Sequence, residues 1–84
     1  MIKILFFGKL REDLNTNCIE ISDLSELTTV DKIRVHLSES YGPSWQKTLN
    51  QSNIVISVNQ VVVPAETAIQ DGDELAFFPP MTGG

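Results

Sequence analysis

The sequence predicts an α+β domain with a β-grasp arrangement, in which a mixed sheet packs on one main helix. Strand-like segments open and close the chain, at 1–8 and 74–79, so the first and last strands can pair at the centre of the sheet. One amphipathic helix at 28–43 separates two opening strands from three later ones. The resulting order, β-β-α-β-β-β, favours a small sheet covered by a single helix on one face.

The opening segment MIKILFFG is the clearest strand, because it is rich in β-branched and aromatic residues and ends in a glycine. Alternation places on one face Ile2, Ile4 and Phe6. The other face carries Lys3, Leu5 and Phe7. Because both faces are largely apolar, this strand is either central in a covered sheet or lends a face to a partner. A second strand, CIEIS at 18–22, is expected to form a hairpin with it through a loop at 9–17.

The helix at 28–43 is predicted from an apolar stripe formed by Val30, Ile33, Leu37 and Tyr41. Thr28 or Thr29 is the expected N-cap, and Thr28 with Asp31 resembles a capping box. Gly42 followed by Pro43 is a stop signal. The segment 44–51 is expected to form a short second helical turn.

The later segments NIVISVN and VVVP read as strands joined by a tight turn at Asn59-Gln60. A turn at 71–73 leads into the last strand, ELAFFP. In that strand Leu75 and Phe77 share one face, and Ala76 and Phe78 the other.

If the helix covers one face of the sheet, the opposite face carries an apolar set comprising Leu5, Phe7, Val62 and Phe78. A partner surface explains such a set better than the alternative, in which segments 10–17 or 43–53 cover it.

Composition limits the possible functions. The chain has 84 residues, which is one domain, expected at 1–80 with a flexible C-terminal tail at 81–84. The net charge of −5 and the lack of a basic patch argue against nucleic-acid binding. No segment approaches the length of a membrane span, and one cysteine allows no disulfide framework, so a cytoplasmic protein without membrane contact is expected.

The folded body is predicted to hold no active site and no metal. His36 lies mid-helix among polar residues, and Cys18 sits at a strand edge with no nearby cation to activate it. The pair Asp71 and Asp73 flanks a glycine and is read as a turn, because a calcium loop needs a longer pattern.

The remaining unusual feature is the terminal Gly83-Gly84, which follows the stiff pair Pro79-Pro80. A thread without side chains can enter a narrow channel, and its carboxylate can be adenylated and then converted to a thiocarboxylate. This favours a carrier whose reactive group is its own C-terminus, over the simpler alternative of an inert, disordered end.

The motifs extend this interpretation. The segments MIKILFFGKLRE, TTVDKIR, VNQ at 58–60 and DGDELAFFPPMTGG at 71–84 resemble the small, sulfur-carrier subunit of molybdopterin synthase, the MoaD family. The likeness runs essentially from end to end, and it implies a ubiquitin-like fold. Carriers for thiamine synthesis and ubiquitin-like modifiers for tRNA thiolation share the fold and the Gly-Gly, but are not expected to show Phe-Phe-Pro-Pro before it.

The resemblance implies a specific chemistry. An E1-like adenylating enzyme would activate the Gly84 carboxylate with ATP, with no cofactor bound permanently. A sulfur donor, such as a cysteine desulfurase or a rhodanese-like protein, would then supply the thiocarboxylate sulfur. The charged carrier would dock on the large, catalytic synthase subunit, in a heterotetramer, and give sulfur to cyclic pyranopterin monophosphate to form the molybdopterin dithiolene. The protein would thus be a substrate and subunit rather than a catalyst by itself.

The resemblance also implies contact residues. Phe7, Val62 and Phe78 match positions used against both the adenylating enzyme and the large subunit, although Val62 is smaller than the expected leucine. Arg11 matches a basic position near the tail that can pair with an acidic partner group. The segment that would enter the partner comprises Pro79, Pro80, Met81, Thr82, Gly83 and Gly84.

Three alternatives stay open at this level. The chain could be a ubiquitin-like modifier that joins Gly84 to lysines of target proteins, a sulfur carrier for tRNA thiolation or thiamine synthesis, or an interaction module with an inert tail. Deleting Gly84 would abolish activity in every case except the last.

Overall fold

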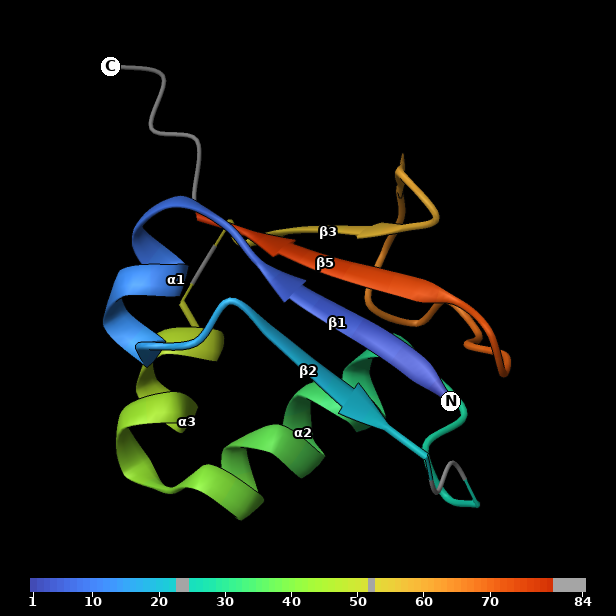
Figure 1. The fold of residues 1–84 in the computed structure, drawn as a ribbon, viewed down its shortest axis with the longest axis horizontal. Coiled ribbons are helices and arrows are strands. Elements are labelled where there is room, and N and C mark those ends of the chain that lie inside the picture. The colour runs from blue at the N-terminus through green and yellow to red at the C-terminus, as the bar shows by residue number, and fades with distance from the viewer. Residues whose placement is uncertain (23–24, 52, 80–84) are drawn as a thin grey trace.

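The computed structural model describes residues 1–22, 25–51 and 53–79. A five-stranded sheet with the order β2-β1-β5-β3-β4 carries three helices (Figure 1). In chain order the elements are β1 (Ile2–Phe6), α1 (Gly8–Leu14), β2 (Cys18–Ile21), α2 (Val30–Tyr41), α3 (Pro43–Leu49), β3 (Val55–Val58), β4 (Val61–Val62) and β5 (Glu74–Phe78).

The first and last strands lie side by side in the middle of the sheet, as the sequence predicts (Figure 1). They run parallel, with Ile4 opposite Leu75 and Phe6 opposite Phe77. The pairs β1–β2, β3–β4 and β3–β5 are antiparallel. Because β1 and β5 point the same way, both strands end at the same edge of the sheet, and α1 begins there.

The core lies between the sheet and the helices. It contains the predicted inner faces of β1 and β5 and most of the α2 stripe, namely Ile2, Ile4, Phe6, Val30, Ile33, Leu37, Leu75 and Phe77, all at most 2% exposed. Tyr41, predicted as part of this stripe, is instead 51% exposed. It lies on the last turn of α2, where its ring stacks on that of Trp45 with centroids 4.2 Å apart.

The prediction of a loop at 9–17 is wrong over most of that segment, because α1 occupies Gly8–Leu14. Leu10 and Leu14, four residues apart on one helix face, are both buried in the core. The helix ends at Asn15, whose left-handed backbone (φ 52°) forms the C-cap. The expected pairing of β1 and β2 is therefore present and antiparallel, but a helix rather than a loop joins the two strands.

The main helix α2 starts and stops close to the predicted signals. Thr29 is the N-cap, and its side-chain oxygen accepts a hydrogen bond of 3.2 Å from the Lys32 amide. The alternative capping box that starts at Thr28 is wrong, because the helix begins one residue later. Gly42, with φ 96°, ends α2 and directly precedes α3, which is longer than the single turn expected.

Helix α3 packs on the same side of the sheet as α2. Its Trp45 ring meets the ring of the core residue Phe6 edge-on, with centroids 5.4 Å apart. Together with the burial of Leu10 on α1, this contact places the segments around 10–17 and 43–49 on the helical side. Neither segment covers the opposite face of the sheet within the described part of the chain, so the alternative in which they do is wrong there.

Candidate functional site: the open sheet face and the end of β5

The face of the sheet turned away from the helices is apolar and partly exposed. We call the set Leu5, Phe7, Val62, Ala76 and Phe78 the open face. Phe7 and Val62 are 38% and 70% exposed. The alternation predicted from the sequence is confirmed, because the neighbours of these residues along β1 and β5 are the buried core residues.

A shallow hollow of about 220 Å³ lies in the open face. It is lined by Phe7, Ser57, Gln60, Val62, Glu74, Ala76 and Phe78. Ser57 on β3 stands opposite Ala76 on β5 and also opposite Val62 on β4. Since Ser57 and Ala76 have small side chains, the sheet is hollowed between the larger residues around them.

Two aromatic rings form the wall of this hollow nearest the end of the sheet. Phe7 and Phe78 stack with centroids 4.8 Å apart and an interplanar angle of 5°. These residues come directly after β1 and at the end of β5. A preformed aromatic pair offers a partner a large apolar contact at little cost in side-chain entropy.

The chain leaves β5 beside this aromatic pair. The Phe7 amide donates a 3.1 Å hydrogen bond to the Phe77 carbonyl, which extends the pairing of β1 and β5 by one residue. Pro79 then lies against Gly8, the first residue of α1. The open face and the point at which the chain continues toward residue 80 are therefore adjacent.

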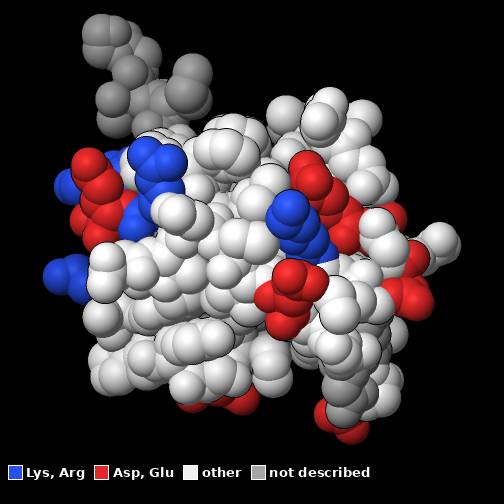
Figure 2. Space-filling model, in the orientation of Figure 1, with Lys and Arg blue, Asp and Glu red and all other residues white. Residues whose placement is uncertain are grey.

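Charged groups flank the open face rather than occupy its middle. Figure 2 shows basic and acidic side chains gathered over α1 at the left and others toward the opposite end of the sheet, with a broad uncharged surface between them. Arg11, the predicted basic contact, is exposed on α1. Glu74 and Gln60 give the hollow a polar rim at the end away from the aromatic pair.

Four of the predicted contact residues come together here. The open face and its edge contain Phe7, Val62, Phe78 and Pro79. Arg11 lies in the last turn of α1 and does not line the hollow. The other predicted site residues, Pro80, Met81, Thr82, Gly83 and Gly84, lie outside the described residues. Sequence reasoning missed Ser57 and Ala76 as the floor of the hollow, although two small residues within apolar strands were a usable signal.

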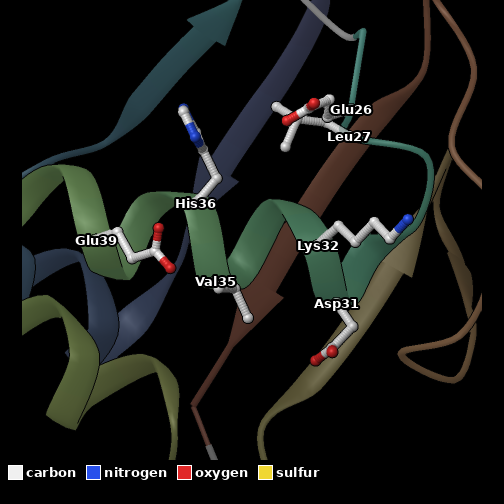
Figure 3. Close-up of a pocket in the computed structure, with 7 residues that line it drawn as sticks. All are labelled: Glu26, Leu27, Asp31, Lys32, Val35, His36 and Glu39. Carbon is white, nitrogen blue, oxygen red and sulfur yellow. The ribbon is translucent and has the colours of Figure 1, made fainter.

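A second hollow, of about 260 Å³, lies on the outer surface of α2 (Figure 3). Its side chains diverge: His36 and Val35 point in opposite directions, and Lys32 extends away from both. No reacting group is aimed at a common point. Within residues 1–22, 25–51 and 53–79 there is no group of three acidic, histidine or cysteine side chains that could hold a metal.

The two other polar candidates are isolated. His36 is exposed on α2, and the Cys18 thiol is exposed at the start of the edge strand β2. Of the helices that the structure describes, none is long and apolar enough to cross a membrane.

A parallel central strand pair, antiparallel flanking strands and a helix across one face place the protein in the ubiquitin-like β-grasp class. Solved structures agree with this assignment. SAMP1 from Haloferax volcanii has a TM-score of 0.78 at 22% identity, covering 99% of this chain and 98% of that one. The complex of subunits 1 and 2 of molybdopterin-converting factor from Helicobacter pylori gives 0.65 at 20% identity, with 99% and 97% covered.

Within this class, the chain belongs to the ThiS family, which matches residues 4–84. Two relatives are each named molybdopterin synthase sulfur carrier subunit. The protein from Haemophilus influenzae is 37% identical over 84 residues, covering 100% of both chains. The protein from Escherichia coli is 38% identical over 84 residues, again covering 100% of both. The resemblance and the fold class predicted from the sequence are confirmed.

Proposed function

We propose that this protein is the sulfur carrier subunit of a molybdopterin synthase, and that its reactive group is the carboxylate of Gly84. The observation that carries this proposal is the adjacency of an apolar docking face to the end of β5. The stacked pair of Phe7 and Phe78 lies next to Pro79, five residues before Gly84. A partner that binds this face is thereby placed beside the segment that carries the carboxylate.

The chemistry requires two partners in succession. The first partner is an E1-like enzyme. On this enzyme, a carboxylate oxygen of Gly84 attacks the α-phosphate of ATP, which forms an acyl-adenylate and releases pyrophosphate. The terminal sulfur of a persulfide, on a donor of the cysteine desulfurase or rhodanese type, then displaces AMP to form an acyl disulfide. A thiol reductant cleaves the S–S bond and releases the thiocarboxylate. The second partner is the large synthase subunit. There, two thiocarboxylated carriers supply the two sulfurs of one dithiolene. The protein holds no permanent cofactor in this scheme, and ATP belongs to the activating enzyme.

Several features support docking through the open face. Apolar side chains at its centre can be desolvated cheaply, and aromatic residues dominate the binding energy of many interfaces. Arg11 lies in the last turn of α1, outside the apolar centre, where it can pair with an acidic group at the rim. The net charge of −5 also favours partners with a basic surface and accelerates their encounter.

We expect this function in the cytoplasm. Activation consumes ATP, and the described chain carries one free thiol, Cys18, and no disulfide.

The test is a reconstituted synthase reaction. The thiocarboxylated chain, the large subunit and cyclic pyranopterin monophosphate are combined, and formation of the dithiolene is followed by its conversion to a fluorescent oxidised derivative. We expect product with the thiocarboxylated chain and none with the carboxylate form. The matched control is a chain lacking Gly84, which retains every described residue.

Other outcomes identify the alternatives. Product with tRNA-thiolation or thiamine enzymes, but not with the large subunit, would assign the carrier to another pathway. Isopeptide bonds between Gly84 and lysines of target proteins would make it a modifier. Normal product from the chain that lacks Gly84 would contradict the carrier function altogether.

A further inference from the structure

The first residue of α1, Gly8, lies close to the first residue after β5, Pro79. Gly8 has a left-handed backbone with φ +57°, which side chains rarely adopt. A Cβ atom built on Gly8 would lie 3.1 Å from Cγ and 3.4 Å from Cδ of Pro79. The shorter of these separations is tighter than most real Cβ contacts, so a side chain at position 8 would press on the proline ring.

This combination distinguishes Gly8 from the other glycines that the structure describes. Gly42 and Gly72 also have positive φ values, of +96° and +93°, yet a Cβ atom on either would meet nothing within 4 Å. At those two positions glycine is needed only because the backbone has a positive φ. At Gly8 it serves both the backbone and the close approach of a second segment, 71 positions later in the chain.

We propose that Gly8 is a positioning residue for the C-terminal tail, because its missing side chain sets the direction in which the chain leaves β5 at Pro79. The inference rests on the proposed function, in which that direction delivers the Gly84 carboxylate to the activating enzyme. Gly8 would act on the reacting carboxylate indirectly, through the position of Pro79.

The surrounding contacts explain why Pro79 cannot yield easily. On the strand before it, the Phe77 carbonyl is held by the Phe7 amide at 3.1 Å. Phe78 is stacked on Phe7 with centroids 4.8 Å apart. Since the chain up to Phe78 is held and the proline ring locks its own φ, we expect an added Cβ atom to push the ring away from Gly8 by a few tenths of an ångström.

A tilt of the Pro79 ring acts at the start of the segment that ends in Gly84. The five residues that follow can reach at most about 17 Å when extended, and the first of them is another proline. A small rotation at Pro79 would therefore redirect the segment that carries the Gly84 carboxylate. Misplacement of a reacting group by about 1 Å can lower a rate by up to about a hundredfold.

The experiment compares Gly8→Ala and Gly8→Asn with Gly72→Ala. All three add a side chain at a positive φ, but the third adds it in open space. Asparagine tolerates the left-handed backbone better than alanine does, so the pair at position 8 separates backbone strain from the added Cβ atom. The rate of pyrophosphate release by the E1-like enzyme, measured against carrier concentration, gives kcat and KM for each variant.

We expect kcat to fall about tenfold for both position 8 variants, with KM unchanged because the open face is intact. Gly72→Ala is expected to keep the wild-type kcat, even if it lowers the melting temperature as much. In the Gly8→Ala background, Pro79→Ala should remove the clash, so that the double variant has the same kcat as Pro79→Ala alone. Equal kcat for wild type and both position 8 variants, or a loss confined to KM, would overturn the proposal.

A second measurement uses the wild-type chain and does not depend on a folded variant. Nuclear Overhauser contacts are expected between the Gly8 α-protons and the ring protons of Pro79, and their absence would also overturn the proposal. The two failures are distinguishable. If the wild-type chain releases no pyrophosphate with a competent enzyme, the proposed function fails. If the wild-type chain is adenylated and the position 8 variants have the same kcat, only the role of Gly8 is refuted.

Discussion

Asn59 holds the turn between β3 and β4 and also fastens that turn to the start of β5. Its backbone and that of Gln60 have φ values of 51° and 71°, the positive pair that a two-residue hairpin of this kind requires. Its side-chain amide donates to Asp73 Oδ1 at 2.9 Å, and its side-chain oxygen accepts from the Glu74 amide at 3.0 Å. One side chain thus links two connections that lie beside the rim of the hollow.

Replacing this side chain should lower the free energy of unfolding. We expect Asn59→Ala to cost about 2–3 kcal/mol, from two lost hydrogen bonds and a left-handed backbone that alanine disfavours. Asn59→Gly keeps the backbone conformation and should cost less, about 1–2 kcal/mol. Urea unfolding measures both values. Wild-type stability in both variants would show that the amide contributes nothing.

Residue-scale features were predictable where their cause is local. The turn at Asn59-Gln60 follows from neighbours in sequence, and so does the choice of Gly42 as a helix end. The close approach of Gly8 to Pro79 was not predictable, because it depends on the register in which β1 and β5 pair and not only on the pairing itself. Sequence alone identifies Gly8 only as the end of a strand.

Among the elements, α1 is the helix that the sequence did not predict. It has seven residues, of which only Leu10 and Leu14 are apolar and buried. That is too short for a periodic pattern to stand out, and the asparagines that follow it favour a loop. A helix this short is stabilised by packing rather than by its own propensity. The longer α2, with three buried stripe positions and clear ends, was predictable for the same reasons that make it stable.

The packing of α1 can be tested at Leu10, which is 1% exposed. We expect Leu10→Ala to lower the free energy of unfolding by about 2–5 kcal/mol, through lost burial and the cavity left behind. Lys9→Ala, on the exposed side of the same helix, is the matched control and should change it by less than about 0.5 kcal/mol. Denaturant unfolding measures both. Equal effects of the two substitutions would contradict the contribution of α1 to the core.

At the scale of the whole molecule, the two sides of the sheet differ in burial. The helical side holds the core, and the open face is the surface that we propose for association. The sequence predicted this division, because alternation along the first and last strands assigned each apolar residue to a side. The small residues Ser57 and Ala76 were a signal for a hollow, but its shape depends on the register that brings Ser57 opposite Ala76 and beside Val62.

This division predicts which apolar residues matter for binding. Phe7→Ala should weaken binding to the large synthase subunit by tenfold or more, since a truncated aromatic anchor typically costs over about 1.4 kcal/mol. Val35→Ala is the control, because Val35 is 43% exposed but lies on α2, away from the open face. Calorimetric titration gives both dissociation constants. A larger loss from Val35→Ala than from Phe7→Ala would move the docking surface to the helical side.

The central claim is that Gly84 carries the sulfur, and intact mass spectrometry tests it most directly. The chain is incubated with ATP, an E1-like adenylating enzyme and a sulfide source, and is then fragmented. Fragmentation is needed because oxidation of Met1 or Met81 adds nearly the same mass as replacing oxygen by sulfur. We predict a mass increase confined to Gly84. An unmodified Gly84, with an enzyme proven active on another carrier, would contradict the account.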